Sequence, residues 1–367
     1  MKRFADQGHR VLYVETQVHW VTYLREISRR FARAFSFMRG RRQVSENLWV
    51  VTPPLVLPFF QMNRAICRIN NALLTLFTKY HMRRLGFAKP IVYNYTPYSS
   101  FLVKKLDPAR SVYECVDEFA VDKGLVRKAV VEDLENETIE QSDVVIVTAR
   151  NLQEKKRHPN RYTYLIPNAA DIEHYRDVNR DEVKPAEVYN DLPKPVVGFL
   201  GALAYWIDID LIAYLADHLP TYSFVFVGPV SVDIARLRGR DNVHFLGRKP
   251  FDELPGYLAG MDVCINPYVL DDIAAGCSPL KLYEYIAAGK PVVSVRMPEA
   301  EQFADIVQIA DSYEDFARLI ENTVAKDHSW KRQLARKSWV EAQNHTWDKR
   351  FEQTVSVLEE CFDEDRD

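Results

Sequence analysis

The sequence predicts an α/β protein built from two doubly wound, Rossmann-like domains. Short β-branched segments alternate with helical patterns along almost the whole chain, as expected for parallel sheets with helices on both faces. A charged, proline-bearing segment without clear periodicity, residues 176–195, separates two series of such segments and has the composition of a linker. With 367 residues, the chain is long enough for two domains.

The first series of strands belongs to a predicted N-terminal domain at residues 1–175. A doubly wound domain normally opens with a strand and a loop, but residues 2–8 look like the end of a helix closed by Gly8. The first strand of this domain is therefore expected to be absent from the chain. The predicted strands cover residues 10–15, 48–52, 90–94, 111–115, 144–148 and 164–167.

The second series belongs to a predicted C-terminal domain at residues 196–335. Apolar residues then recur at helical spacing over residues 330–362, so residues 336–367 are expected to form a last helix and a tail. The predicted strands of this domain cover residues 196–201, 223–228, 243–247, 263–267 and 292–295.

The composition excludes several classes of protein. A net charge of −3 gives no reason to expect nucleic acid binding, and five scattered cysteines suit reduced thiols. The polar start lacks the apolar region of a signal peptide, and no uninterrupted apolar run of about 18 residues is present. The dispersed histidines form no metal-binding motif. The expected location is the cytoplasm. Peripheral attachment to the inner face of the cell membrane is the alternative.

The segment that begins at Ser278 predicts a helix start that holds a phosphate. Ser278 suits the N-cap and Pro279 the first helical position. Lys281 lies in the first turn, where a cation is unfavourable unless an anion binds. Glu284 lies one turn further on, and Gly289 closes the helix. The alternative is an ordinary crossover helix with a solvated Lys281 and Glu284.

Three further strands of the second series end at glycines, Gly201, Gly228 and Gly247. Small residues at such turns let a ligand approach the backbone, although tight packing explains them equally well. The spacing does not match GxGxxG, so a dinucleotide site is not expected. Arg248 follows the last of these turns and could touch a base or a phosphate, or lie free on the surface.

In the first domain, Asp117 and Glu118 follow a buried strand, and Asp122 lies nearby. A carboxylate at this position can act as a general base, but it can equally cap the next helix.

Two basic, apolar segments, residues 20–42 and 59–87, have helical spacing. Basic amphipathic helices can lie on anionic lipid. The alternative is a pair of core-packed helices with solvated faces.

Residues 198–298 resemble the donor domain of GT-B glycosyltransferases, especially the teichuronic-acid-type and glucuronosyltransferase-like enzymes of bacterial polysaccharide assembly, in the glycosyltransferase family 4-like group. The first domain adds two similar segments, at residues 113–118 and 166–171. The motifs of the donor domain are Gly201-Ala202-Leu203, Phe226-Val227-Gly228, His244-Phe245-Leu246-Gly247-Arg248, Ser278-Pro279-Leu280-Lys281-Leu282-Tyr283-Glu284-Tyr285 and Gly289-Lys290-Pro291-Val292-Val293.

The resemblance implies two domains facing a cleft, a C-terminal helix that crosses back to the first domain, and a role for each matching residue. Lys281 would neutralise the donor diphosphate, helped by backbone donors from Ser278 to Leu280. Glu284 would bind ribose hydroxyls, the turn at Gly247 and Arg248 the base edge, and Asp117 would be the acceptor-side base. The family members need neither metal nor cofactor besides the nucleotide-sugar, here most simply a UDP-sugar.

The sequence departs from the large retaining family at two places. The second glutamate of that family is replaced by Gly276, and its cation pair after the first donor-domain strand is missing from residues 205–210. The stereochemistry of transfer therefore stays open.

The predicted function is glycosyl transfer from a nucleotide-diphosphate sugar to a lipid-linked or polysaccharide acceptor in cell-surface glycan synthesis. One alternative is a nucleotide-sugar epimerase of the same fold, which needs no acceptor surface. Another is a catalytically degenerate GT-B protein that only binds a nucleotide or a partner. The basic segments favour the lipid-linked acceptor.

Overall fold

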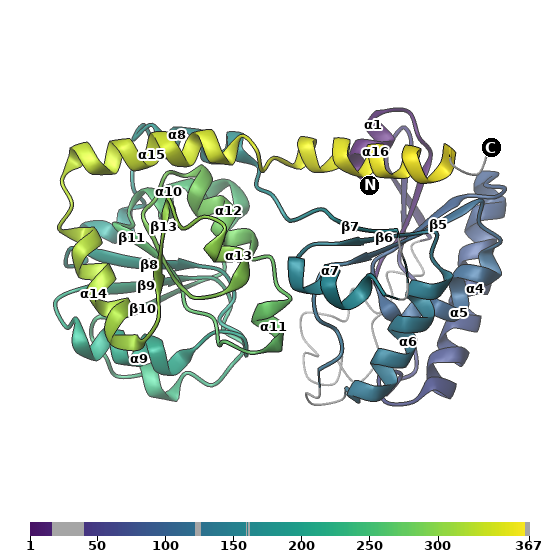
Figure 1. The fold of residues 1–367 in the computed structure, drawn as a ribbon, viewed down its shortest axis with the longest axis horizontal. Helices are drawn as coiled ribbons and strands as arrows, with labels where there is room; N and C mark the ends of the chain where they lie inside the picture. The colour runs from purple at the N-terminus through teal and green to yellow at the C-terminus, as the bar shows by residue number, and fades with distance from the viewer. Residues whose placement is uncertain (17–39, 122–125, 159, 161, 364–367) are drawn as a thin grey trace. The chain divides into compact units, whose positions relative to one another are not determined.

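A computed structural model describes residues 1–16, 40–121, 126–158, 160 and 162–363 (Figure 1). The chain divides into two compact units. Unit 1 comprises Met1–Val147, Gln153–Tyr164 and the chain from Ser356 onward, whereas unit 2 comprises Thr148–Leu152 and Leu165–Val355. Both units combine helices with sheets that contain parallel strand pairs, so the predicted α/β class is confirmed.

Unit 1 contains two sheets among its described residues. The first has the order β1-β3-β2, with β1 parallel and β2 antiparallel to β3. The second has the order β4-β5-β6-β7, with parallel pairing from β4 to β6. Their bounds are β1 Val11–Val14, β2 Arg41–Ser45, β3 Leu48–Val51, β4 Ile91–Asn94, β5 Arg110–Cys115, β6 Val144–Val147 and β7 Thr163–Leu165.

The helices of unit 1 have clear local end signals. The chain opens with α1, and Gly8 follows it with a φ of 90°, in the left-handed region expected of a closing glycine. The longest helix, α4, begins after Asn63, whose side chain accepts the N–H groups of Ala65 and Ile66, and ends before Gly86 at a φ of 67°. The helices are α1 Lys2–Asp6, α4 Arg64–Leu85, α5 Ser100–Val103, α6 Lys128–Gln141 and α7 Arg150–Lys156, with 3-10 turns at Pro97–Ser99 and Lys104–Leu106.

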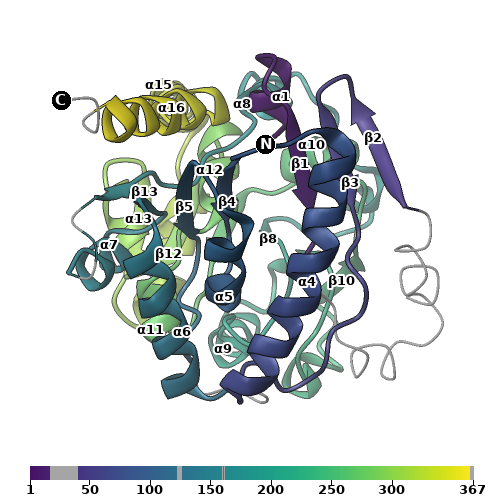
Figure 2. The same ribbon diagram turned by 90° about the vertical axis from the view of Figure 1, so that its right-hand side faces the viewer.

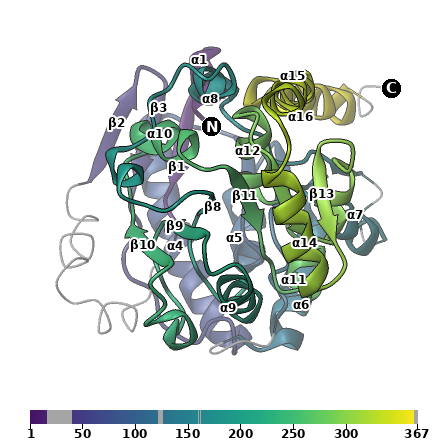
Figure 3. The same cartoon turned by 90° about the vertical axis from the view of Figure 1, so that its left-hand side faces the viewer.

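Unit 2 is built on one six-stranded sheet in which every pair of neighbours is parallel, in the order β10-β9-β8-β11-β12-β13. The helices α9 and α14 pack side by side next to this sheet (Figure 3). The strands are β8 Val196–Leu200, β9 Ser223–Val227, β10 Val243–Gly247, β11 Val263–Asn266, β12 Val292–Val295 and β13 Val307–Ala310. The helices are α8 Ile172–Asn179, α9 Ile209–His218, α10 Leu254–Ala259, α11 Asp272–Ala275, α12 Leu280–Ala287, α13 Pro298–Glu301, α14 Tyr313–Val324, α15 His328–Ala342 and α16 Trp347–Asp363, with 3-10 turns at Glu187–Asn190, Ala235–Leu237 and Phe251–Glu253.

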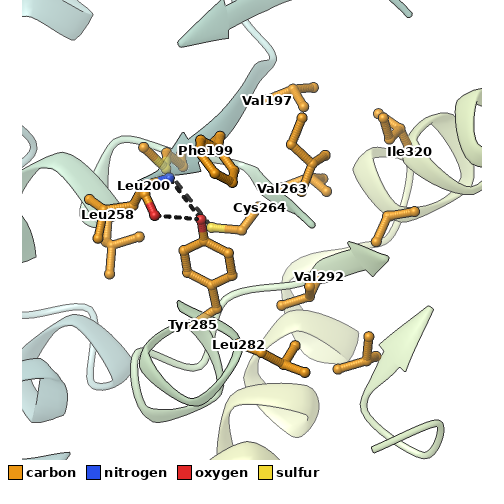
Figure 4. Packing of buried hydrophobic residues seen from close by; sticks show 14 of the residues in the cluster. Val197, Phe199, Leu200, Leu258, Val263, Cys264, Leu282, Tyr285, Val292 and Ile320 are labelled. Atoms are coloured by element: carbon orange, nitrogen blue, oxygen red, sulfur yellow. Dashed lines mark hydrogen bonds between the residues drawn. The ribbon is translucent and has the colours of Figure 1, made fainter. Parts of the chain in front are cut away.

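The central strands of unit 2 are buried along their whole length, which explains their near-continuous apolar sequence. Tyr285 anchors α12 to this core, because its hydroxyl accepts the N–H of Leu200 at 2.7 Å (Figure 4). Gly198 is required by packing, since a Cβ there would lie 2.0 Å from the sulfur of Met261.

The boundary between the units lies at Leu165 rather than at residue 175, and residues 176–195 are not a free linker. Tyr175 in α8 and Tyr189 in the 3-10 turn that follows are 0% and 4% exposed and belong to the core of unit 2. Their apolar burial outweighs the charged composition that suggested a linker.

The helical segment predicted at residues 330–362 is two helices, α15 and α16. The side chain of Thr346 accepts the N–H of Lys349 at the start of the second one, which separates them. The chain passes from unit 2 to unit 1 within α16, and in unit 1 Cys361 lies 3.3 Å from the hydroxyl of Tyr164.

Two predictions fall wholly or partly outside the described residues. The basic segment at 20–42 is described only from residue 40, and Asp122 is not described. The second basic segment contains α4, which runs along the front of unit 1 in Figure 2. No helix within the described ranges is long and apolar enough to span a membrane.

Candidate functional site

Three glycine turns meet at the carboxyl ends of β8, β9 and β10. Gly201 donates its N–H to the carbonyl of Val227 at 2.9 Å, and Gly228 donates to the carbonyl of Gly247 at 2.9 Å. A Cβ at Gly228 would lie 2.0 Å from the carbonyl oxygen of Gly201. The three turns therefore lie together at the edge of the sheet where ligands bind in open α/β folds.

Lys281, in the first turn of α12, lies directly beside the first of these turns. Its Nζ donates to the hydroxyl of Tyr268 at 2.7 Å and lies 4.8 Å and 5.3 Å from the ring centroids of Tyr268 and Phe199. A Cβ at Gly201 would come within 2.9 Å of its Cε. The glycine and the lysine of the sequence prediction thus belong to one site.

The surroundings of Lys281 favour an anionic ligand. Burial lowers the pKa of its ammonium, because the surrounding protein removes hydration. Among the described residues no carboxylate lies within 4 Å of its Nζ; Tyr268 and Phe199 offer only a neutral oxygen and two ring faces. An anion placed here would restore the lost stabilisation of the charge.

Ser278 is not the N-cap of α12. The helix begins at Leu280 after Pro279, and no side chain caps it. The Ser278 hydroxyl instead accepts the N–H of Asn168 at 3.3 Å, and the Asn168 amide donates to the Ser278 carbonyl at 2.7 Å. This long-range pair ties the loop after β7 to the helix start, and it leaves the first backbone N–H groups of α12 uncapped by a side chain.

Glu284 lies one turn further along α12, beside two residues of α8. Burial raises the pKa of Glu284, opposed by the hydroxyl of Tyr175 and by the neighbouring Lys281 and His174. The His174 ring stacks on Phe251 with centroids 3.9 Å apart, and its Nε2 donates to the Phe251 carbonyl at 3.0 Å. The carboxylate therefore lies in a partly dry site, near a tyrosine hydroxyl and the Lys281 ammonium.

Arg248 follows Gly247, whose φ is 68°, and its side chain is exposed. Within the described ranges it makes no ion pair. The structure therefore brings Lys281, Gly201 and Glu284 close together and leaves Arg248 at the rim of the same sheet edge.

Asp117 lies in unit 1, two residues after β5. Its side chain is exposed to solvent, but partial loss of hydration raises its pKa to about 6. It does not cap α6, the next helix in the described part of the chain, because the N-cap of α6 is Arg127. The capping alternative is therefore wrong, and a carboxylate with a pKa near neutrality suits a general base.

A buried network supports the loop that carries Asp117. Lys156 donates to Glu135 at 2.6 Å and lies 3.7 Å from Glu118, and the hydroxyl of Tyr113 donates to Glu135 at 2.9 Å. The thiol of Cys115 donates to the Asp117 carbonyl at 3.3 Å. The loop is thus held on one side by a thiol and on the other by an ion pair.

Sequence reasoning missed Tyr268 and Tyr175. Tyr268 follows β11 by two residues, so its place at the carboxyl edge of a predicted strand was available as a signal. Tyr175 lies near Glu284 because α8 packs against α12. The spacing of residues in the sequence does not predict that contact. Within the described ranges no three His, Cys, Asp or Glu residues gather as they would around a metal ion.

The match to a protein family lies within the second unit. Residues 194–326 match the family described as "Glycosyl transferases group 1". A Bacillus subtilis (strain 168) protein named as a teichuronic acid biosynthesis glycosyltransferase, TuaH, is 25% identical over 206 residues, 52% of this chain and 51% of that protein. A 2-deoxystreptamine glucosyltransferase of Streptomyces kanamyceticus is 31% identical over 136 residues, 32% of this chain and 34% of that enzyme. The chain thus matches about half the length of the first relative and a third of the second.

Solved structures match almost the whole chain. Sucrose-phosphate synthase from Thermosynechococcus elongatus has a TM-score of 0.69 at 16% identity and covers 96% of this chain and 99% of its own. The Anabaena protein HepE, in complex with UDP and glucose, has a TM-score of 0.63 at 16% identity with the same coverage. At these identities the likeness shows the fold alone. The chain therefore has the GT-B fold, and its residues 194–326 match the family model of the group 1 glycosyl transferases.

Proposed function

We propose that this protein transfers a sugar from a nucleoside-diphosphate sugar, most simply a UDP-sugar, to a lipid-linked or polysaccharide acceptor in cell-surface glycan synthesis. The observation that carries the proposal is Lys281, partly buried against two aromatic rings beside the Gly201 turn and without a carboxylate partner in the described chain. The family match, a relative named for teichuronic acid biosynthesis and a structural neighbour in complex with UDP support it.

On the donor side, the chemistry is stabilisation of a leaving group. As the glycosidic bond breaks, negative charge grows on the nucleoside diphosphate, and the Lys281 ammonium and the start of α12 meet it there. Glu284 accepts hydrogen bonds from ribose hydroxyls, and Arg248 approaches the base edge. In this proposal Lys281 provides the charge that a metal ion provides in other transferases, and no resident cofactor takes part.

On the acceptor side, Asp117 removes the proton of the attacking hydroxyl. A carboxyl with a pKa of about 6 is mostly ionised at neutral pH and is still basic enough to accept a proton in the transition state. This assignment implies an inverting transfer. The network of Glu135, Lys156 and Glu118 keeps the Asp117 loop in position.

The proposed place of action is the cytoplasm, at the inner face of the cell membrane, where a lipid-linked acceptor is available. The basic and apolar character of α4 supports this part of the proposal.

Titration calorimetry with UDP, GDP, dTDP and their sugars tests the donor site, followed by product analysis with and without an extract of lipid-linked glycans. We expect one nucleotide to bind well and its sugar to be transferred only when acceptor is present. Sugar conversion without acceptor would instead identify an epimerase. Nucleotide binding without any conversion would identify a binding protein, and binding of no nucleotide would overturn the proposal.

A further inference from the structure

The long helix α4 of unit 1 exposes a row of large apolar side chains to solvent. Four large side chains at positions i, i+4, i+7 and i+11 are exposed: Ile69 by 50%, Leu73 by 49%, Leu76 by 69% and Tyr80 by 55%. We call these four residues the α4 stripe. A surface helix ordinarily turns such a stripe toward the core.

The opposite face of α4 is buried and mixes apolar with polar side chains. The apolar ones are Cys67, Leu74, Met82 and Leu85, and the polar ones are Asn70, Asn71, Thr75, Thr78 and His81. Asn70 bonds to both the N–H and the carbonyl of Leu57, and the amide of Asn71 donates to the carbonyl of Tyr98 at 2.7 Å. The orientation of the helix is therefore fixed by specific hydrogen bonds, and the α4 stripe cannot turn inward without breaking them.

The charges on α4 have one sign. The helix carries five cationic residues and no carboxylate. Arg64 is paired with Glu137 at 3.1 Å and Arg68 lies over the Phe101 ring. Lys79 and Arg83 lie beside the α4 stripe on the helix surface and, within the described ranges, make no ion pair. Interaction with the helix dipole explains why Arg83 and Arg84 lie in the last turn. It does not explain why the four apolar residues of the α4 stripe are exposed.

We propose that the α4 stripe, flanked by Lys79, Arg83 and Arg84, docks this protein on an anionic lipid surface. Exposed apolar side chains enter the boundary between headgroups and acyl chains, while the cations remain among anionic headgroups. Tyr80 suits the interface because its ring is apolar and its hydroxyl polar.

Charge complementarity selects lipid over two other occupants. A second copy of this chain would bring an equally cationic α4 against the first. Residues 17–39 of the chain carry five arginines and a single acid, Glu26, so they too have the same sign as α4. An anionic bilayer supplies both the opposite charge and an apolar layer.

The inference adds a partner surface to the proposed function and gives a reason for a lipid-linked acceptor. It is nevertheless tested without turnover, so the two can fail separately. Loss of vesicle binding with intact nucleotide binding would count against the α4 surface alone. Loss of nucleotide binding with intact vesicle binding would count against the donor site alone.

The experiment is co-sedimentation of the full chain with vesicles of phosphatidylcholine, with and without phosphatidylglycerol. We expect binding only to the anionic vesicles, with the affinity falling as salt rises. The triple variant Ile69→Ser, Leu73→Ser, Leu76→Ser should bind about tenfold more weakly or worse. Lys79→Gln with Arg83→Gln should lower the affinity by about tenfold as well. Nucleotide affinity in solution should stay unchanged in both.

Matched controls lie on α15, in unit 2. Val340 is 64% exposed and Arg336 is exposed, so Val340→Ser and Arg336→Gln change the same chemistry elsewhere on the surface and should leave vesicle binding intact. Wild-type protein that stays in solution with anionic vesicles, or a triple variant that binds them like the wild type, would overturn the proposal. So would a wild-type dimer that the triple variant converts to a monomer without any lipid binding.

Discussion

Two lysines, one in each unit, both lose hydration through burial, but their pKa values shift in opposite directions. Lys156 in unit 1 is 8% exposed, and although burial alone would lower its pKa, Glu135 and Glu118 outweigh burial and raise it. Lys281 in unit 2 faces a tyrosine hydroxyl and aromatic rings, and burial lowers its pKa. The first lysine already has its counter-charge inside the protein. The second has no carboxylate within 4 Å among the described residues, so in the proposed function a ligand brings the counter-charge.

A third lysine shows that a lowered pKa alone does not identify a ligand site. Burial also lowers the pKa of Lys290, but its ammonium donates to the carbonyls of Ala259 and Met261 at 3.0 Å each. Those bonds join α12's end to the loop before β11. Of these three lysines, Lys281 alone combines a dry site, a glycine turn that accommodates its side chain, and a position at the carboxyl edge of the sheet.

The largest expected effect is on stability, from Lys156→Met. It leaves Glu135, which is 1% exposed, without its partner, and breaking a buried pair costs about 3–5 kcal/mol. Urea unfolding should show this loss, and adding Glu135→Gln should recover much of it. A single variant as stable as the wild type would show that the ion pair is not the structural one described.

Asp117→Asn should slow transfer by about a hundredfold or more and leave donor binding unchanged, because an amide cannot take up the proton. In the wild type, kcat/KM should rise with pH through about 6, the pKa of Asp117, and then level off, since only the ionised form acts as base. Steady-state kinetics across pH measure both effects. Asp107→Asn, an exposed acid of the same unit, is the control, and an unchanged pH profile in the Asp117 variant would remove the base assignment.

Lys281→Met should weaken nucleoside-diphosphate binding by about 1.5–3 kcal/mol, the range for a hydrogen bond to a charged group. Its unfolding free energy should fall far less than that of the Lys156 variant, because Lys281 loses a bond to a neutral hydroxyl and only a longer-range interaction with Glu284. Calorimetry measures the nucleotide affinity of the variant, and urea unfolding measures its unfolding free energy. Lys337→Met, at an exposed position of α15, should alter neither, and wild-type affinity in the Lys281 variant would contradict the phosphate role.

The smallest effect is expected from Tyr268→Phe, which removes the oxygen that accepts from Lys281 but keeps the ring. The unfolding free energy should fall by about 0.5–1.5 kcal/mol. The same change in a Lys281→Met background should cost less, because the bond to Lys281 is already absent. Equal costs in the two backgrounds would mean that the hydroxyl has another role.

Local patterns predicted much of the fold and part of the site. Eleven predicted strands correspond to strands of the structure, while β2 and β13 were missed. Both missed strands contain polar residues, and β2 is mostly exposed on the edge of its sheet, so neither has the apolar run of a buried strand. The glycine turns and Lys281 were recognisable because a strand followed by glycine, and a cation in a first turn, are local features.

The sequence by itself determined the α/β class, the glycine-ended strands and the positions of Lys281 and Glu284 on one short helix, because these depend on residues within a few turns of each other. Only the tertiary structure decided that Ser278 binds Asn168 instead of capping α12, that Tyr268 and Tyr175 flank the two charged groups, and that α4 presents its apolar side chains to solvent. Such contacts join residues far apart in the chain. Their free energy depends on which faces the fold brings together, and no local spacing records that.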